Sequence, residues 1–535
     1  MKSLTLSILI LLSCELLSQT YFSKVYTVHE DGTGFLNVWP NYLRAVFPTD
    51  SLIYAFGYSA DTTYKQIDGT GFFVFNTEGE LLEYYHIKDT AGYNYFYPEG
   101  IHTWDGITFY TSFNNFYREE SILKFNRFTK QQEVLKISNS IIANGDILRG
   151  NMVASIDGCL FTASDIAINS DYNYKIQVTK IDTQGNIKWQ TIVGNEPINA
   201  FINTCFSAFA DHSGNVYIGV NYNDFVPGTR TSFQSLFYKL DSNGVIKKSY
   251  SSKLAYEGFH HIFDIAQDVN GRFYLSSNYN YNGPTFPYGT YGYGVIQLLD
   301  SNLNFEGFIN LNYDTIITGP EIKTYEKVIR ANGNDGVLVG GLEIRHDSVI
   351  DYIDSLNRFD TIMIGHYVMT LLKINYNKEI EWKRHYRIRN GYDNGWLFDI
   401  KPFPGGGYVI GAESFEGYAY EKFKLPYFMP WLLRVDDDGC LIPSCGTIST
   451  KNEKKEDQLL IYPNPASHYI VLLNSSQEKT NYQIVSLDGK IMDEFSTLIP
   501  GEQIIIPISE YLPGSYFVTA KSKVRRSITK SFIKK

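Results

Sequence analysis

The segment from Trp396 to Leu441 begins WLFDIKPFPGGGYVIGAES, continues through a Tyr- and Phe-rich stretch, and ends PWLLRVDDDGCL. Two runs of β-branched and aromatic residues flank a Gly-rich turn, and a third run closes on an Asp-Gly turn. This is the pattern of a three-stranded antiparallel meander. The same pattern recurs along the chain, so the fold is built from repeats.

Seven copies of the third strand and its closing turn can be aligned. They begin at Phe72 (FFVFNTEGE), Ile122 (ILKFNRFTK), Val178 (VTKIDTQGN), Phe237 (FYKLDSNGV), Ile296 (IQLLDSNLN), Leu371 (LLKINYNKE) and Leu432 (LLRVDDDGC). An Asn or Asp opens each turn, at positions 76, 126, 182, 241, 300, 375 and 436, a period of about sixty residues. A hairpin precedes each copy, and a short fourth strand follows it, most clearly from Ile187 and from Ile380. Four strands repeated seven times predict an all-β, seven-bladed β-propeller.

Ring closure favours this interpretation over an open β-helix, whose repeats are usually shorter and need no hairpin in every unit. A closed ring also shelters strand edges that would otherwise invite aggregation. The segment Tyr21 to Glu30 precedes the first hairpin and belongs to no unit. We expect it to supply the outer strand of the last blade.

The connections differ between the two ends of the blades. Antiparallel order places the first-to-second and third-to-fourth turns at one end and all other connections at the opposite end. The first set consists of short Asp/Gly turns, and the second includes long Tyr-, Asn- and Gly-rich segments such as Asn278 to Tyr293. Tyr gives a large contact area at low entropic cost, and Asn and Gly adapt, so this loop face suits recognition. The alternative is that the aromatic residues fold back and cap the blades. The candidate ligand-binding residues are Tyr281, Tyr288, Tyr291, Tyr418 and Tyr420.

The N-terminus has the pattern of a secretory signal peptide, with a charged start and a largely apolar run from Leu4 to Leu12. We expect a signal peptide at residues 1–18, cut after Ser18, and a propeller at 19–445. A lipoprotein box ending at Cys14 is the competing interpretation. No later apolar run is long enough to cross a bilayer, so no transmembrane segment is expected in the mature chain.

Four cysteines remain after such cleavage, and an even number in an exported chain permits disulfides. Cys440 and Cys445 bracket a four-residue turn and are the predicted pair. Cys159 and Cys205 lie in different repeats and are expected to be simply buried.

The chain changes character after Cys445. Residues 446–458 are polar, charged and without periodicity, which indicates a linker. Residues 459–535 contain six short strand-like runs (LLIYP, YIVLL, YQIVSL, KIMDEF, QIIIPI and SYFVTA), with Asp488-Gly489 as a hairpin turn. About 75 residues of short strands predict a small β-sandwich.

Four motifs in this domain carry a specific resemblance. They are LIYPNPAS (460–467), SLDGK (486–490), LPGSYFV (512–518) and KSFIK (530–534), in this order at the C-terminus. Residues 459–535 resemble the type A C-terminal sorting domain of the type IX secretion system. The propeller region resembles, more loosely, the propeller-like repeats found in front of such domains, and that likeness carries no function.

The resemblance implies a two-membrane bacterium, passage to the periplasm and then across the outer membrane. Its expected partners are the type IX secretion machinery and a sortase-like protease that removes the domain in or near the linker. The protein would end at the cell surface or be released. Within the signal, Pro463, Asn464, Pro465, Gly489 and Gly514 would serve folding or recognition rather than catalysis.

Charge excludes one class of partner. Residues 459–535 carry nine Lys/Arg and six Asp/Glu, residues 446–458 balance, and the total is −10, so residues 1–445 carry −13. Nucleic acids and anionic membranes call for a basic face. We therefore expect no nucleic-acid partner.

The chain carries few sequence signatures of catalysis or metal binding. The chain has no Gly-x-Ser-x-Gly, no His-Glu-x-x-His and no phosphate-binding Gly-rich loop. His260 and His261 are adjacent strand residues and so point to opposite faces, which argues against a metal pair. Asp436-Asp437-Asp438 resembles part of a calcium loop but lacks its spaced ligands, and hydrogen bonding within the turn is the simpler interpretation. No catalytic residue, cofactor or metal is therefore predicted.

Acidic residues expected on the loop face, Asp347, Asp351, Asp354 and Glu416, are interpreted as part of a charged, solvated loop. Two hypotheses follow from the sequence. In the first, the propeller is a non-catalytic module that binds a glycan, a peptide or a neighbouring surface. In the second, it is a glycan hydrolase or lyase that uses acidic residues on the loop face.

Overall fold

The computed structural model shows an all-β chain. It describes residues 21–25, 43–60, 67–88, 96–114, 120–137, 150–155, 157–167, 174–194, 200–224, 232–252, 259–280, 292–311, 323–330, 336–353, 358–387, 394–416, 427–441, 459–474, 480–498, 502–522 and 527–535. Every regular element named in these ranges is a β-strand, as the repeat pattern predicts.

Within the described residues, the strands before the linker are grouped here by their antiparallel pairing into blades 1 to 7; five of these are separate four-stranded sheets, and blades 5 and 6 are joined in one larger sheet by a parallel pairing of Tyr293 with Lys323. Blade 1 contains β2 (Leu43–Pro48), β3 (Leu52–Ala60), β4 (Ile67–Asn76) and β5 (Leu81–Lys88). Blade 2 contains β6 (Phe96–His102), β7 (Thr108–Asn114), β8 (Glu120–Asn126) and β9 (Gln132–Lys136). Blade 3 contains β10 (Gly150–Ala154), β11 (Leu160–Ala167), β12 (Tyr174–Ile181) and β13 (Ile187–Val193).

The next three blades repeat this order. Blade 4 contains β14 (Ala200–Ala210), β15 (Val216–Asp224), β16 (Ser232–Leu240) and β17 (Ile246–Ser251). Blade 5 contains β18 (Phe259–Gln267), β19 (Phe273–Asn280), β20 (Gly292–Leu299) and β21 (Phe305–Asn310). Blade 6 contains β22 (Lys323–Arg330), β23 (Val337–Ile353), β24 (Arg358–Ile374) and β25 (Ile380–Arg387).

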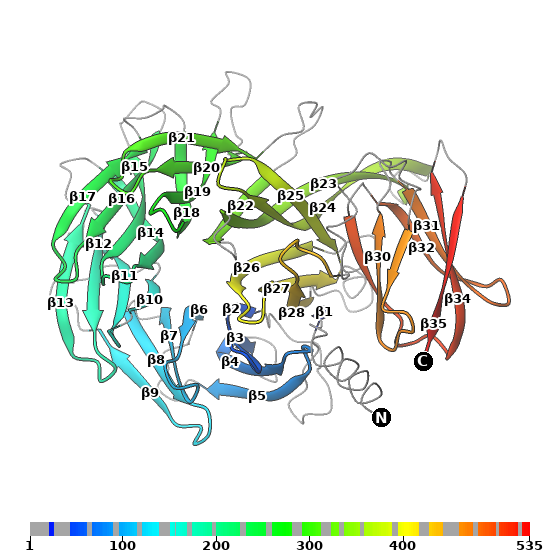
Figure 1. The fold of residues 1–535 in the computed structure, drawn as a ribbon, viewed down its shortest axis with the longest axis horizontal. Helices are drawn as coiled ribbons and strands as arrows, with labels where there is room; N and C mark the ends of the chain where they lie inside the picture. The colour runs from blue at the N-terminus through cyan, green and yellow to red at the C-terminus, as the bar shows by residue number, and fades with distance from the viewer. Residues whose placement is uncertain are drawn as a thin grey trace, which may run out of the picture.

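The last blade joins the two ends of the propeller. Blade 7 contains β26 (Asn394–Pro402), β27 (Tyr408–Glu416) and β28 (Tyr427–Val435), and its outer strand is β1 (Phe22–Val25). Figure 1 shows the blades arranged in a ring, with blade 1 beside blade 7 and the first strand of each blade nearest the centre. The prediction of a β-propeller is confirmed, as is the role of the N-terminal segment as the outer strand of the last blade.

Side chains lock this closure. The Phe22 ring packs so closely on Gly79 of blade 1 that a Cβ at Gly79 would lie 2.2 Å from a ring carbon. The buried Trp431 indole Nε1 donates to Ser23 Oγ at 2.8 Å. The Arg434 guanidinium donates to the carbonyl oxygen of Thr77 at 2.9 Å. The short N-terminal strand is therefore fastened on both sides.

The turns of one face are closed by their own first residues. In the third-to-fourth turns, each predicted Asn or Asp accepts from backbone amides two to four residues on, as Asp182 Oδ1 does from Gln184 and Asn186 at 3.0 and 2.9 Å. The other such residues are Asn76, Asn126, Asp241, Asp300, Asn375 and Asp436. This face therefore has short turns whose polar groups are already used.

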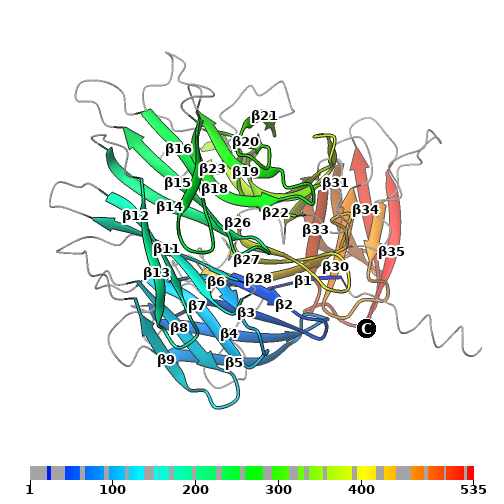
Figure 2. The ribbon, with the colours of Figure 1, turned by 60° about the vertical axis from the view of Figure 1, so that its left-hand side comes forward.

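Blade 6 departs from the sequence prediction. The residues around Asp347 and Asp351 were expected in a charged loop, but β23 continues to Ile353, and Asp351 lies opposite Asp360 of β24. β-Branched and aromatic residues alternate with polar ones on both sides of this segment, which favours a long antiparallel ribbon. Figure 2 shows this ribbon extending from the ring on the side of the C-terminal domain.

The C-terminal domain is a sandwich of two sheets, as predicted. One sheet contains β29 (Leu459–Tyr462), β30 (Tyr469–Asn474) and β33 (Glu502–Pro507). The other contains β32 (Ile491–Leu498), β31 (Thr480–Ser486), β34 (Gly514–Ser522) and β35 (Ile528–Lys534). The sandwich lies at the side of the ring, next to blades 6 and 7 (Figures 1 and 2). The first sheet is joined to blade 6 through β25, a contact that the sequence did not predict.

Candidate functional site

The predicted ligand-binding tyrosines all lie outside the described residues. Tyr281, Tyr288 and Tyr291 fall between β19 and β20, and Tyr418 and Tyr420 fall between β27 and β28. Their role in binding therefore stays a prediction. What the structure describes is the set of strand ends from which these connections leave.

Buried polar side chains occur near those strand ends. On the second strands they include Ser112, Ser164, Asn221, Ser277 and Ser414, and on the third strands Thr70, Ser121, Gln177 and Ser235. At the opposite ends, the residues just before the turns are buried and apolar, as with Phe75, Leu240 and Val435. A layer of buried hydrogen-bonding groups thus lies beneath the loop face.

One group of residues at this level combines an exposed aromatic side chain with a buried carboxyl group. Trp396 lies near the loop-face end of β26, the innermost strand of blade 7, and the residue is 41% exposed. Directly across the ladder lies Glu413 of β27, which is only 6% exposed. Arg44 of β2 places its guanidinium 4.9 Å from the centroid of the Phe398 ring. Arg44, Trp396, Phe398 and Glu413 are called the Trp396 site below.

Asp399 aligns the two central strands that form this site. Its Oδ2 accepts from the backbone amide of Val46 at 2.9 Å, and its Oδ1 pairs with Lys401 Nζ at 2.9 Å. The first contact joins blade 7 to blade 1 beside Arg44. The carboxylate therefore has a structural role and holds the Trp396 site together.

Burial raises the pKa of Glu413 to about 8, although the positive charge of Arg44 acts to lower it. The carboxyl group is therefore mostly protonated at neutral pH. A protonated carboxyl both donates and accepts hydrogen bonds. Together with the partly exposed Trp396 and the guanidinium of Arg44, this gives a group suited to a polar ligand with one apolar face.

A second buried polar group lies on the face of blade 6 that packs on blade 5. Glu343 forms an ion pair with Lys383, and its Oε2 lies 3.8 Å from His385 Nδ1. Thr370 Oγ1 lies 2.9 Å from the same nitrogen of His385. Because Glu343 is paired with Lys383, this group resembles a structural ion pair more than an open site.

Other sequence candidates are placed only in part. Asp347 and Asp351 lie in β23, Glu416 ends β27 and His260-His261 lie in β18, and Asp354 is outside the described residues. In the turn of Asp436, Oδ1 accepts from the amides of Asp438 and Cys440 at 3.0 and 2.6 Å, as the simpler interpretation expected. Among the described residues, no three His, Cys, Asp or Glu side chains gather in a way that could hold a metal ion.

Cys440 is fully buried and disulfide-bonded. The predicted partner, Cys445, lies outside the described residues, so the pairing stays a prediction. Cys159 is a free thiol of intermediate exposure, and burial raises its pKa.

In the C-terminal domain, Asn464 fastens the last strand. Its Nδ2 donates to the carbonyl oxygen of Ser531 at 3.1 Å, and its Oδ1 accepts from the amide of Ile533 at 3.0 Å. The Ala466 amide donates to the Ile533 carbonyl at 2.8 Å. The segment with Pro463 and Pro465 thus covers the outer edge of β35, which protects an edge strand from pairing elsewhere.

The four sequence motifs meet at this end of the sandwich. Gly514 pairs with Lys534, and Ser486 pairs with Tyr516. Gly489, at a φ of 86°, closes the predicted turn by donating its amide to the Ser486 carbonyl at 3.0 Å. Four apolar side chains stand exposed around this end, Leu487 at 75%, Leu512 at 78%, Ile491 at 52% and Ile533 at 49%. We call these four residues the apolar end.

Comparison with known proteins agrees with this assignment. Residues 460–535 match the sequence profile of the secretion system C-terminal sorting domain. No curated protein matches the chain significantly. The sorting domain marks the chain for type IX export, to the outside or to the outer surface of the cell. The described part of the chain contains no helical segment with the length and hydropathy of a bilayer span.

Several solved structures are similar at low identity. The α-L-arabinanase of Penicillium chrysogenum, in complex with arabinobiose, is 10% identical with a TM-score of 0.40, over 60% of this chain and 93% of that one. The GH74 xyloglucanase of Xanthomonas campestris is 9% identical with a TM-score of 0.41, over 95% and 68%. The periplasmic gluconolactonase of Pseudomonas aeruginosa is 9% identical with a TM-score of 0.39, over 85% and 98%. The assignment of the fold rests on the strand pairing described above.

Proposed function

We propose that the exported chain is a binding protein whose propeller takes a glycan at the Trp396 site on the loop face. The observation that supports this most is the exposed indole of Trp396 beside the buried carboxyl of Glu413, on strands next to the centre of the ring. Aromatic faces stack on the apolar faces of sugar rings, and a guanidinium and a neutral carboxyl supply hydrogen bonds to hydroxyl groups. The Tyr-rich connections around the same face would add contact area.

A glycan array with the purified full-length chain tests this proposal. We expect retention of a restricted set of glycans, and at least a tenfold loss of affinity for Trp396→Ala, because a stacking contact is removed. Trp104 is equally exposed, at 41%, but lies in a turn of the opposite face, so Trp104→Ala is the matched control. Equal glycan binding by Trp396→Ala and Trp104→Ala would contradict the assignment of the Trp396 site.

The alternative function is a glycan hydrolase or lyase, and the protonated carboxyl of Glu413 supports this alternative. A carboxyl that stays protonated near neutral pH is what a general acid requires. A hydrolase would place a second carboxylate within roughly 5 to 10 Å of it. Release of product that is lost in Glu413→Gln would select the enzyme, and binding without product would select the binding module.

We propose in addition that the apolar end of the sorting domain is the surface that the export machinery contacts. Four exposed apolar side chains at one end are more than scattered surface residues, and such patches often mark interaction sites. In a host with type IX secretion, Leu512→Ser should lower the exported fraction several-fold. Val245→Ser, at a 52% exposed position of a propeller turn, is the control and should export normally.

A further inference from the structure

The edge of blade 6 is occupied by the sorting domain. β25 is the outermost strand of blade 6, and it pairs in parallel with β33, with His385 opposite Glu502, Tyr386 opposite Gln503 and Arg387 opposite Ile504. The sheet then continues through β30 and β29. An edge strand of the propeller is thus extended by a sheet from the other domain, as in strand-addition complexes.

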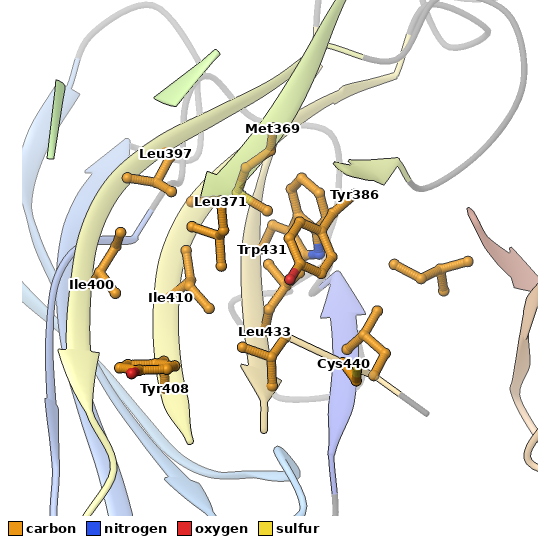
Figure 3. Close-up of a cluster of buried hydrophobic side chains, with 14 of the residues drawn as sticks. Met369, Leu371, Tyr386, Leu397, Ile400, Tyr408, Ile410, Trp431, Leu433 and Cys440 are labelled. Atoms are coloured by element: carbon orange, nitrogen blue, oxygen red, sulfur yellow. The ribbon is translucent and has the colours of Figure 1, made fainter. Parts of the chain in front are cut away.

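The joining sheet is buried on both faces. Ile504 and Ile506 of β33 pack into the core of the sandwich, whereas Ile505 between them joins Val471 and Leu473 of β30 in a cluster with the propeller. On the propeller side this cluster consists mainly of residues from blades 6 and 7, including Met369, Leu371, Tyr386, Leu397, Trp431 and Leu433 (Figure 3). Apolar residues on both faces are typical of a sheet covered on both sides.

A buried polar contact fixes the register. Gln503 is fully buried, its Oε1 accepts from the amide of Leu441 at 3.0 Å, and its Nε2 donates to the carbonyl of Gly439 at 3.3 Å. The Tyr386 hydroxyl of blade 6 donates to the same carbonyl. One side chain of the sorting domain therefore satisfies two backbone groups just after the last strand of blade 7. A buried polar group of this kind is costly to leave without partners.

We infer that blades 6 and 7 form a docking site for the chain's own sorting domain, and that this site holds the domain after the linker has been cut. None of the contacts above involves residues 446–458. The apolar end lies on the opposite sheet or at its rim, so a docked domain still presents it. This inference does not depend on which ligand the propeller binds.

The test uses the full chain with a site for a specific protease placed in residues 446–458. After complete cutting, both fragments should elute together in size-exclusion chromatography, and a gel of the peak should show both. Immediate separation of the fragments would overturn the inference.

Two substitutions locate the site. Gln503→Ala should speed the release of the cut domain about tenfold, because the buried Leu441 amide loses its hydrogen bond to Gln503 and the Gly439 carbonyl keeps only the one from Tyr386. Gln483, in the outward sheet, donates to Glu494 at 2.6 Å and is only partly buried, so Gln483→Ala is the control. Tyr386→Phe leaves the sorting domain unaltered and removes the propeller's own donor to the Gly439 carbonyl, the group to which Gln503 also donates, so release should speed up here too. Release rates that are the same in all these variants would contradict the proposed contacts.

Discussion

Glu413 predicts a specific pH dependence of stability. Its pKa is about 8 in the folded chain, against an ordinary value of 4.5. Between these values the unfolded chain releases the proton and the folded chain keeps it, so the free energy of unfolding falls as the pH rises. The fall is about 1.4 kcal/mol for each pH unit. From pH 5 to pH 7 the loss is about 3 kcal/mol, and Glu413→Gln removes it because the amide does not ionise.

Urea unfolding at pH 5, 6, 7 and 8 measures this effect. The quantity of interest is the difference in unfolding free energy between Glu413→Gln and the parent protein, because all other titrating groups cancel in that difference. The difference should grow in favour of the variant by about 3 kcal/mol from pH 5 to pH 7. A difference that stays flat for Glu413→Gln would refute the assignment of a neutral, buried carboxyl.

Three further predictions concern the scaffold. Gly79→Ala should lower the free energy of unfolding by at least about 2 kcal/mol, because Gly79 has a φ of 71° and an added Cβ would collide with the Phe22 ring. Gly106 has a similar φ of 66° but no neighbour within 4 Å, so Gly106→Ala should lower it by only about 1 kcal/mol. Chemical denaturation measures both changes. Asp211→Ala should cost about 1 to 2 kcal/mol by the same assay, and Asp211→Asn much less, because an amide oxygen still accepts the two turn amides. Asn464→Ala should speed hydrogen exchange in β35 without changing exchange in blade 3; equal protection in the variant and the parent would contradict the role given to its side chain.

The repeat and its turns were predictable from sequence because they are local. Each turn is closed within five residues by an Asn or Asp that forms the same hydrogen bonds wherever it occurs, as at Asn76 and Asp300. The N-terminal strand was predicted to be the outer strand of the last blade because it precedes the first repeat and a closed ring needs a fourth strand there. The long ribbon of β23 and β24 was missed because Asp347 and Asp351 suggested solvent, although β-branched neighbours already indicated strands.

The site was less accessible from sequence because it depends on contacts between distant segments. In the sequence, Trp396 is only the first residue of a predicted strand, and its neighbours in the chain do not indicate that it is exposed. The raised pKa of Glu413 depends on burial between blades 7 and 1, beside Arg44 from the other end of the propeller. The contact between the sorting domain and the propeller did have a signal in the sequence. β33 contains three consecutive isoleucines, Ile504 to Ile506, whereas a strand with one exposed face would alternate apolar and polar residues.

The closure of the ring also sets an order of assembly. β1 is made first, but its partner β28 follows about four hundred residues later, and Ser23 and Trp431 are 408 positions apart. Closing a loop of that length costs about 5 kcal/mol of chain entropy, so this pairing is unfavourable until the intervening blades are in place. The first strand must therefore wait while the ring is built, and a chain that stops short of β28 leaves it without a partner. Burial of Trp431 against Ser23 thus reports that the propeller is complete, and the part of the fluorescence signal that is lost in Trp431→Phe records that last step.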